Sequence, residues 1–399
     1  MPVDGAGELA LQSATIGSHT ASDGMKIGMI VPRLDSGGAG QCVVDLTNGL
    51  AEGGFDPTVV CLERMGYLAE KICGRHVKVI APFKRAGNDP MTPFRLAAIF
   101  RENHFDVVHC HNWGALVDTV VAAKLARITA VLHTQHGLDY GFNNSPDHLR
   151  SRLRTLMKAV ACRGVAKVAT VSDEVAQMAT REWHVPASKV CVVHNGVRLP
   201  QLDRVHDLRL QWRRELGVEE TDVLIGTAAT FRPVKDLHTM LEAMSLVTRA
   251  SSHARLVVLG DGPLKNDLEA TVKRLGLGSV VRFPGWCPDA AQVFPALDLF
   301  VLSSLSEGIS LALLEAMAAG VPVVATAVGG NRDVLAGPNT GLLVPPRSPH
   351  DLAHAMLSLI DDPTRRHTLS AGGRGRVEEA FSLQRMVREY EGLYRSLMN

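Results

Sequence analysis

Short runs of hydrophobic residues alternate along the chain with longer stretches of helical periodicity. From Lys26 onward, each apolar run is followed by a loop and then by a stretch whose apolar positions recur about every three or four residues. The predicted strands of the first half lie at 26–31, 57–62, 77–80, 107–110, 130–134 and 168–171. The predicted helices lie at 41–52, 65–74, 92–103, 114–126, 147–163 and 173–183. This alternation predicts a parallel, doubly wound α/β sheet.

The pattern stops near Arg198 and starts again at Val223. Residues 199–220 are rich in charge and are predicted to form an irregular linker. The second half has predicted strands at 223–229, 255–260, 280–283, 299–302 and 322–325, and predicted helices at 236–249, 263–275, 288–296, 310–319, 350–360 and 383–398. Two successive sheets of one kind predict two facing Rossmann-like domains, residues 25–198 and 221–381, with a cleft at the carboxyl ends of their strands.

The segment from Ser303 to Gly320 contains a loop that is followed by the most apolar of the predicted helices. Between Ser310 and Ala319 the only polar residues are Ser310 and Glu315. A helix that is apolar on all sides is expected to be packed on all sides, so the Glu315 carboxylate needs a partner that the helix does not supply. Glu307 is a second carboxylate at the same end. The alternative is that the charge of Glu307 interacts favourably with the helix dipole and that Glu315 reaches a surface groove.

Composition narrows the class of protein. The 399 residues suit two domains, and the formal net charge of +1 gives no general case for binding nucleic acid. Hydrophobic residues make up 46% of the chain but aromatic residues only 5%, which suits parallel sheets covered by helices and offers no aromatic platform for single strands.

Cysteine content and the chain's start indicate a compartment. The seven cysteines are scattered and include no C-x-x-C pair, which favours a reducing cytoplasm. Residues 1–24 have no basic start and no apolar core, so they are predicted to be a disordered tail and not a signal peptide. No apolar run reaches the roughly 18 residues of a membrane span, so membrane contact is expected only at the periphery, on the inner face.

Two cations stand at a predicted strand end. Arg232 and Lys235 precede a helix that Asp236 is suited to cap. Cations at a helix N-terminus oppose the dipole, so their presence beside free backbone amides is explained if an anion binds between them. Two solvated loop charges are the alternative.

Two further loops fall at strand ends of the first domain. The glycine-rich segment 37–40 fits neither G-x-G-x-x-G nor the P-loop, which argues against a dehydrogenase or an NTPase. His136 follows the predicted strand 130–134, whereas the neighbouring histidines and Cys110 show no zinc spacing. No D-x-D stands at a strand end, so no divalent ion is expected.

Together these features suit a nucleotide sugar, and the sequence resembles the retaining GT-B-type glycosyltransferases of family 4. The similarity covers most of the chain, and its most specific part is an E-x7-E motif formed by Glu307 and Glu315. The matching segments are GGAG at 37–40, TQHG at 134–137, VSDEVA at 171–176, VVHNGV at 192–197, RPVKD at 232–236, VVLGDGPLKNDLE at 257–269, and 307–335.

The resemblance implies a role for each candidate residue. It implies that Glu307 contacts the transferred sugar and that Glu315 holds the ribose hydroxyls. Arg232 and Lys235 are implied to bind the diphosphate, with help from the N-terminal amides of the helix and the opposite domain. The further binding positions are Gly38, Gly308, Ile309 and Ser310, and His136 is implied to hydrogen-bond the sugar. Asp333 departs from the family pattern, which often has Glu there.

The resemblance also implies a metal-independent reaction, with a nucleotide-diphosphate sugar as donor and a glycan or lipid-linked acceptor, in cell-surface or exopolysaccharide biosynthesis. The final helix, within 382–399, is implied to cross back to the first domain, although packing on its own domain is the alternative. A basic segment from Arg150 to Lys167 without acidic residues suggests contact with an anionic membrane, or else a solvated basic face. A GT-B-fold epimerase, a phosphorylase and a catalytically silent nucleotide-sugar-binding subunit remain as other functions.

Overall fold

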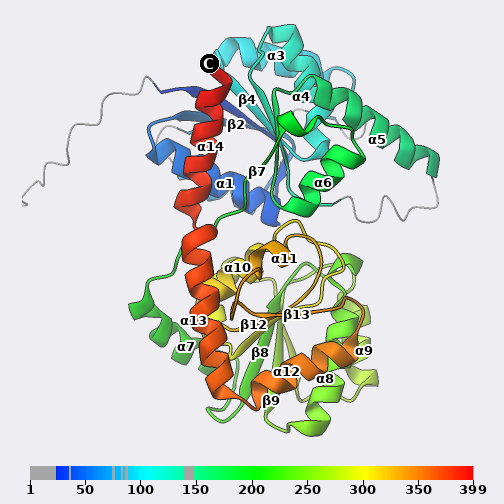
Figure 1. Cartoon of the computed structure of the whole chain (residues 1–399), viewed down its shortest axis with the longest axis vertical. Helices are drawn as coiled ribbons and strands as arrows, with labels where there is room; N and C mark the ends of the chain where they lie inside the picture. The colour runs from blue at the N-terminus through cyan, green and yellow to red at the C-terminus, as the bar shows by residue number, and fades with distance from the viewer. Residues whose placement is uncertain are drawn as a thin grey trace, which may run out of the picture.

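The computed structural model describes residues 24–35, 37–73, 77–81, 84–85, 89–138 and 148–398, with backbone only for 148–150 and 202–203. The predicted N-terminal tail, apart from Gly24, lies outside the described residues. The chain forms two α/β domains stacked end to end (Figure 1).

The first domain is built on a parallel sheet with the strand order β3-β2-β1-β4-β5-β6-β7. Its strands are β1 (Lys26–Leu34), β2 (Asp56–Met65), β3 (Lys78–Ile80), β4 (Val107–His111), β5 (Val131–Gln135), β6 (Lys167–Thr170) and β7 (Val190–Val192). Its helices are α1 (Gly38–Glu52), α2 (Tyr67–Glu70), α3 (Thr92–Asn103), α4 (Trp113–Ala126), α5 (His148–Arg163) and α6 (Asp173–Arg181), followed by the 3₁₀ turn η1 (Ala187–Lys189).

The second domain repeats the plan with the strand order β10-β9-β8-β11-β12-β13. Its strands are β8 (Val223–Ala228), β9 (Ala254–Leu259), β10 (Val281–Gly285), β11 (Leu299–Leu302), β12 (Val323–Thr326) and β13 (Leu342–Val344). Its helices are α7 (Leu202–Glu215), α8 (Leu237–Ala250), α9 (Lys265–Arg274), α10 (Leu311–Ala318), α11 (Asn331–Val334), α12 (Pro349–Ile360) and α13 (Pro363–Ala380).

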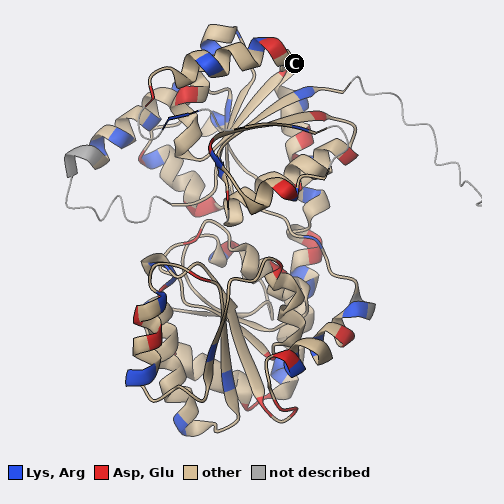
Figure 2. Ribbon diagram, turned by 180° about the vertical axis from the view of Figure 1, so that it is seen from behind, with Lys and Arg blue, Asp and Glu red and all other residues tan. Residues whose placement is uncertain are grey.

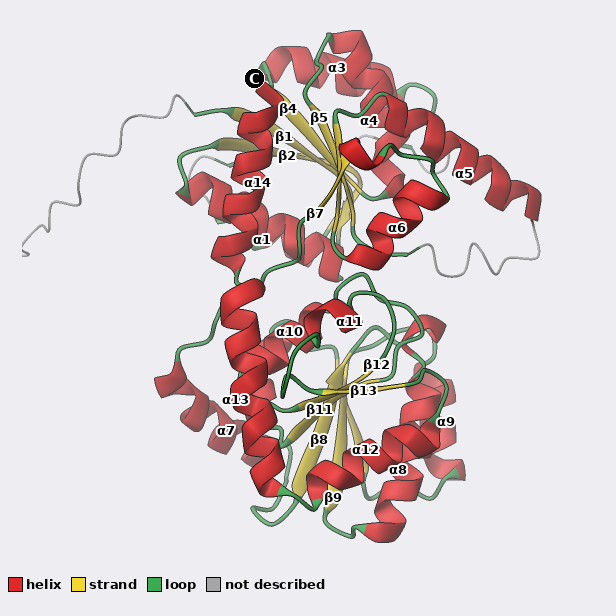
Figure 3. Ribbon diagram, viewed as in Figure 1, coloured by secondary structure: helices red, strands yellow, loops and turns green. Residues whose placement is uncertain are grey.

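Helices cover both faces of each sheet (Figure 3). Two central strands, β4 and β11, are therefore buried along their whole length. In the first domain α3, α4, α5 and α6 contribute to the core on one face, and α1 to the core on the other. Buried parallel strands of this kind explain the unbroken apolar runs of the sequence. The predicted fold class, two Rossmann-like α/β domains, is confirmed.

Two chain segments cross between the domains side by side. Val197 forms a parallel bridge with Ser382, and its backbone N–H donates to the Phe381 carbonyl over 2.9 Å. After this crossing, α14 (Leu383–Met398) lies against α1 of the first domain (Figure 1). Its buried side chains, which include Tyr390 and Tyr394, complete the core on that face of the first sheet.

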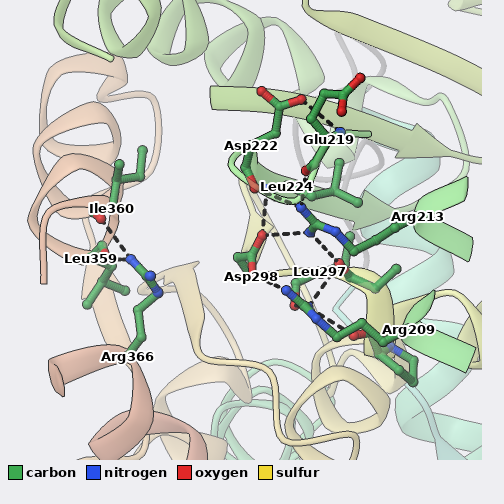
Figure 4. A network of polar contacts seen from close by, with 12 residues as sticks. Arg209, Arg213, Glu219, Asp222, Leu224, Leu297, Asp298, Leu359, Ile360 and Arg366 are labelled. Atoms are coloured by element: carbon green, nitrogen blue, oxygen red, sulfur yellow. Dashed lines mark hydrogen bonds and ion pairs between the residues drawn. The ribbon is translucent and has the colours of Figure 1, made fainter. Parts of the chain in front are cut away.

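The predicted irregular linker at 199–220 is wrong in one respect, because residues 202–215 form α7. Arg209 and Arg213 lie one turn apart on this helix, and both reach Asp298, at 2.6 and 2.9 Å (Figure 4). Arg213 also donates to the backbone carbonyls of Glu219 and Asp222. Arg209 and Arg213, which the sequence analysis placed in an irregular linker, therefore bind α7 to the rest of the second domain.

Other predicted elements also differ from the structure. The helix predicted at 288–296 is two 3₁₀ turns, η3 (Ala290–Gln292) and η4 (Phe294–Ala296), since Pro295 cannot donate to an α-helical ladder. Of the helix predicted at 65–74, only 67–70 is helical among residues 65–73, and residue 74 lies outside the described residues. The sequence analysis missed β7, β13, α11 and α13. Within the described part of the chain, no helix has the length and apolarity needed to cross a bilayer.

Candidate functional site

The loops that carry the candidate residues meet where the carboxyl ends of the two sheets face each other. Gly308, after β11, packs against His136, which follows β5 of the other domain. A Cβ added to Gly308 would lie 2.0 Å from the His136 carbonyl oxygen, so only glycine permits this approach. Gly38, at the start of α1, faces Leu311 of α10, with 3.7 Å between an added Cβ and the Leu311 side chain.

Lys235 and Glu307 form an ion pair in the second domain. The Lys235 Nζ lies 2.6 Å from Glu307 Oε1, and the Ser304 hydroxyl donates to the same oxygen over 2.6 Å. Lys235 ends the turn η2 (Pro233–Lys235), and its backbone carbonyl accepts a hydrogen bond from the Ser303 hydroxyl. Two adjacent serines after β11 therefore hold the backbone of Lys235 and the carboxylate of Glu307, and the pair is fixed from both sides.

Glu315 lies on α10, on the wall of a cavity of about 1090 Å³ between the domains. The cavity is also lined by Gln41 and Asp45 of α1. Among the described residues, the Glu315 carboxylate has no hydrogen-bond or ion-pair partner. Burial, reinforced by the nearby carboxylates of Asp45 and Asp289, raises the pKa of Glu315 to about 8. The charge that the sequence left without a partner is therefore unpaired in the fold as well.

Arg232 and Ser310 are further candidate residues of the second domain, and neither lines the cavity beside Glu315. The Arg232 side chain is exposed, and within the described residues its guanidinium has no partner. Ser310 is the N-cap of α10, and its hydroxyl accepts from the Leu313 N–H over 3.3 Å. The Ile309 carbonyl accepts from the Asn195 side chain of the first domain over 3.4 Å. Arg232 is thus an exposed cation, and Ser310 caps the start of α10.

His136 belongs to a group of histidines at the end of β4 and β5. Its Nε2 lies 3.0 Å from the Nδ1 of His111, and the two rings stack with centroids 5.3 Å apart. Its backbone N–H donates to the side chain of Asn112. Burial lowers the pKa of His136 to about 4, so this imidazole is neutral near pH 7.

The sequence analysis did not identify several residues that hold the site. Ser304 gave no signal, because nothing local links it to Glu307. His111 was set aside as a common neighbour, although its position two residues after His109 on one strand put both on one face of the sheet. Asp333 accepts from the Asp173 N–H at the start of α6 over 2.9 Å, which joins the two domains. Within the described residues, no group of three or more His, Cys, Asp or Glu side chains is arranged to hold a metal ion.

Comparison with known families covers both domains. Residues 36–200 match the model described as Glycosyltransferase Family 4, and residues 209–376 match the model described as Glycosyl transferases group 1.

Individual relatives extend over nearly the whole chain. A D-inositol 3-phosphate glycosyltransferase of Geodermatophilus obscurus is 31% identical, over 88% of this chain and 83% of the relative. An Escherichia coli UDP-Gal:alpha-D-GlcNAc-diphosphoundecaprenol alpha-1,3-galactosyltransferase is 23% identical, over 85% of this chain and 89% of that protein.

Solved structures share the same fold. The crystal structure of Anabaena HepE in complex with UDP-glucose superimposes with a TM-score of 0.79 at 22% identity, over 93% of this chain and all of that one. The family models, the 31% identical relative and the two-domain fold agree. The chain belongs to the GT-B glycosyltransferases of family 4.

Proposed function

We propose that the chain is a retaining glycosyltransferase that moves a sugar from a nucleotide-diphosphate sugar to a glycan or lipid-linked acceptor. The observation that carries this proposal is Glu315, a carboxylate without a partner on the wall of the cavity between the domains. A partly buried carboxylate of this kind is stabilised when hydroxyl groups donate to it, and the two ribose hydroxyls of a nucleotide would do so.

The diphosphate would lie near Arg232 and Lys235. Arg232 has no partner among the described residues, and Lys235 shares Glu307 with Ser304. As the bond to the leaving group breaks, negative charge grows on the diphosphate, and the two cations would stabilise it. Glu307, held 2.6 Å from Lys235, would contact the sugar. Gly38 and the backbone of Gly308, Ile309 and Ser310 would frame the donor.

Retention follows from a reaction on one face of the sugar. The bond from the anomeric carbon to the diphosphate oxygen breaks while the acceptor hydroxyl oxygen bonds to that carbon from the same side. The hydroxyl proton passes to a diphosphate oxygen. His136, neutral because burial lowers its pKa to about 4, would offer the sugar a hydrogen bond without adding charge. No second carboxylate is required as a nucleophile in this scheme.

The two cations also support a reaction that needs no divalent ion. Arg232 and Lys235 would supply the positive charge that a metal supplies in other phosphate-transferring sites. Addition of a chelator should leave the rate of sugar transfer unchanged. A loss of activity that Mg²⁺ or Mn²⁺ restores would refute metal independence.

Thermal shift with UDP-, GDP- and ADP-sugars tests the donor, since a ligand bound to the folded state raises Tm. One nucleotide class should raise Tm, and the product with a suitable acceptor should keep the anomeric configuration of the donor in NMR spectra. A product with the inverted anomer would exclude the front-face reaction. No shift with any nucleotide sugar would remove the donor assignment.

We also propose that α5 rests on an anionic membrane surface and brings the first domain to a lipid-linked acceptor. Leu153, Leu156, Met157 and Val160 recur at helical spacing and are all exposed, with Leu156 60% accessible. Basic residues recur along the same helix (Figure 2). Lys158 does not belong to the exposed basic face of α5, because its side chain is buried between Trp113 and Trp183. An exposed aliphatic stripe beside Arg152 and Arg163 suits the headgroup region of a bilayer.

Flotation with vesicles tests this surface. The wild-type chain should float with vesicles that contain phosphatidylglycerol and not with pure phosphatidylcholine. The double variant Leu156→Gln/Val160→Gln should lose flotation, whereas Leu343→Gln, an exposed apolar position of the second domain, should keep it. Binding that is indifferent to lipid charge, or to the double substitution, would refute the proposal.

The other functions are less well supported. An epimerase is expected to show acid and base residues suited to isomerisation, and a phosphorylase a pyridoxal-phosphate lysine. The combination of His136, Arg232, Lys235, Glu307 and Glu315 argues against a silent binding subunit. Slow hydrolysis of the donor in the absence of acceptor separates a transferase from such a subunit.

A further inference from the structure

We propose that Lys71 and Tyr67 are positioning residues for the donor, because they tie the segment 286–289 of the second domain to the first domain at the wall of the cavity beside Glu315. Tyr67 begins α2, and Lys71 directly follows it. The sequence analysis singled out neither residue, and the motifs of the family resemblance include neither. That the occupant is a nucleotide-sugar donor rests on the proposed function, whereas the contact between the domains does not.

The contact consists of two side chains of the first domain against one segment of the second. The Lys71 ammonium donates to the Pro288 carbonyl oxygen over 3.2 Å, and the Tyr67 hydroxyl approaches the same oxygen at 3.4 Å. The Tyr67 ring meets the Trp286 ring edge to face, with centroids 5.1 Å apart. The Lys71 Nζ also lies 4.8 Å from the centroid of the Tyr67 ring. We refer to these four residues as the α2 contact.

Each side of the α2 contact is anchored within its own domain. The Asn48 side chain of α1 donates to the Lys71 carbonyl and accepts from the Cys73 N–H, both over 3.0 Å, so the end of α2 is held on α1. In the second domain, Gly285 has a φ of 95°, a conformation that favours glycine and turns the chain after β10. The turn η3 that follows packs against α10, the helix that carries Glu315. The α2 contact therefore joins two anchored segments.

The α2 contact forms part of the wall of the cavity between the domains. Asn48 and Lys71 line this cavity from the first domain, and residues 287–291 line it from the second domain together with Glu315. Lys71 is close enough to Glu315 to act on its charge: burial raises the pKa of Glu315, and the Lys71 ammonium opposes that rise. A ligand in the cavity therefore meets a wall whose two halves are joined through Lys71 and Pro288.

The α2 contact should act on donor affinity more than on the rate of the chemical step. A ligand binds more tightly when the wall of its cavity is already in place, because it does not have to order that wall. Loss of one hydrogen bond from a charged group should therefore raise the Kd of the nucleotide roughly tenfold. The residues proposed to contact the diphosphate and the sugar, Lys235 and Glu307, are not disturbed, so kcat at saturating donor should change little.

Three substitutions separate the α2 contact from the charge of Lys71. Lys71→Met keeps most of the side-chain stem and removes the ammonium, and Lys71→Arg restores a charged donor. Tyr67→Leu removes the ring without changing any charge. The control is Lys124→Met, because Lys124 is an exposed lysine of α4 that does not line the cavity.

Isothermal titration calorimetry with UDP, GDP and ADP identifies the nucleotide class and then measures its Kd in each variant. We expect Kd to rise roughly tenfold in Lys71→Met and less in Tyr67→Leu. It should stay near the wild-type value in Lys71→Arg and in Lys124→Met. The double variant Lys71→Met/Tyr67→Leu should show less than the sum of the two effects on binding free energy, since both residues act on the same segment.

Trp286 reports the α2 contact without any ligand or turnover. Its fluorescence is the difference between each chain and the same chain with Trp286→Phe. Trp286 is 52% exposed, and the Tyr67 ring covers part of it. Acrylamide should therefore quench Trp286 more strongly in Tyr67→Leu and in Lys71→Met than in the wild-type chain, and equally in Lys71→Arg.

Two results would overturn the proposal. One is quenching that neither Tyr67→Leu nor Lys71→Met changes. The other is a Kd that Lys71→Met raises and Tyr67→Leu leaves at the wild-type value, because Lys71 would then act through its charge alone. A wild-type chain that binds none of the three nucleotides would instead overturn the proposed function and the assignment of the occupant, while the quenching result would still decide whether the α2 contact joins the domains.

Discussion

The two glutamates of the E-x7-E motif lie in contrasting environments. Glu307 is 9% exposed and has two partners from its own domain, Lys235 and Ser304. Glu315, two turns further on, faces a cavity between the domains without a partner among the described residues. One carboxylate thus has partners within its own domain, and the other has none in the described part of the chain.

The difference fits the proposal that one short segment contacts two ends of a donor. The Lys235 ammonium and the Ser304 hydroxyl hold the Glu307 side chain at a fixed position, which suits contact with a reacting sugar. Burial raises the pKa of Glu315 to about 8, so this carboxyl group is largely protonated near pH 7. Unsatisfied groups of this kind reduce stability and are retained at functional sites.

The largest effect is expected from Lys235→Ala. This change removes the cation of the Lys235–Glu307 pair and a stabilising charge near the leaving diphosphate, so kcat should fall roughly 10²- to 10³-fold. Steady-state kinetics measures the loss, and circular dichroism checks the fold. Lys273→Ala, an exposed lysine of α9, is the matched control. Turnover near the wild-type value in a folded Lys235→Ala protein would contradict the role of Lys235.

Arg232→Ala should have a smaller effect of a different kind. Since Arg232 has no protein partner among the described residues, its loss should leave Tm unchanged. It should lower kcat/KM on the order of 10- to 100-fold, the range for a hydrogen bond to a charged group. A fall in Tm with unchanged kinetics would mean that Arg232 has a structural role and does not bind the donor.

The Glu315→Gln variant tests the second glutamate of the comparison through the pH dependence of stability. The pKa of Glu315 is higher in the folded chain than the ordinary value of 4.5, so the native state holds a proton that the unfolded state releases as pH rises. This group therefore lowers stability progressively from about pH 5 to about pH 8. The Tm of Glu315→Gln should exceed that of the wild type at pH 8 and approach it at pH 5. Its KM for the donor should rise about tenfold. Equal Tm values at pH 8 would mean that Glu315 is solvated.

The smallest effect is expected from Asp333→Ala. Asp333 accepts one hydrogen bond from the Asp173 N–H across the domain boundary, and its side chain is only partly buried. We expect kcat/KM to fall roughly two- to fivefold, and Asp333→Asn to lose less, because an amide oxygen still accepts. An Asn variant weaker than the Ala variant would exclude this contact as the cause.

The repeating strands and helices could be predicted from the sequence because the spacing of apolar residues follows their burial. Strands such as β11 are continuous apolar runs, and the structure places β11 at residues 299–302 as predicted. The helix α13 was missed because it contains Gly372, Gly373 and Gly375, which argue against a helix locally. A Cβ at Gly372 would lie 2.2 Å from the Asn339 carbonyl oxygen, so tertiary packing explains that glycine.

The candidate site divides in the same way. Residues at strand ends, such as Lys235 and Glu307, could be proposed from the sequence because parallel strands bring their carboxyl ends to one edge. The hydrogen bond from Ser304 to Glu307 and the packing of the His111 ring on His109 depend on the directions of side chains that the fold brings together. No local sequence pattern indicates those directions. The family resemblance implied a role for each candidate residue, whereas the structure showed which side chains contact one another.

A structure of the chain with a nucleotide-diphosphate sugar bound tests the central claim most directly. The account predicts that the ribose hydroxyls donate to Glu315 and that the diphosphate oxygens accept from Arg232 and Lys235. A nucleotide bound in the cleft with its ribose away from Glu315, or with the diphosphate away from both cations, would contradict it.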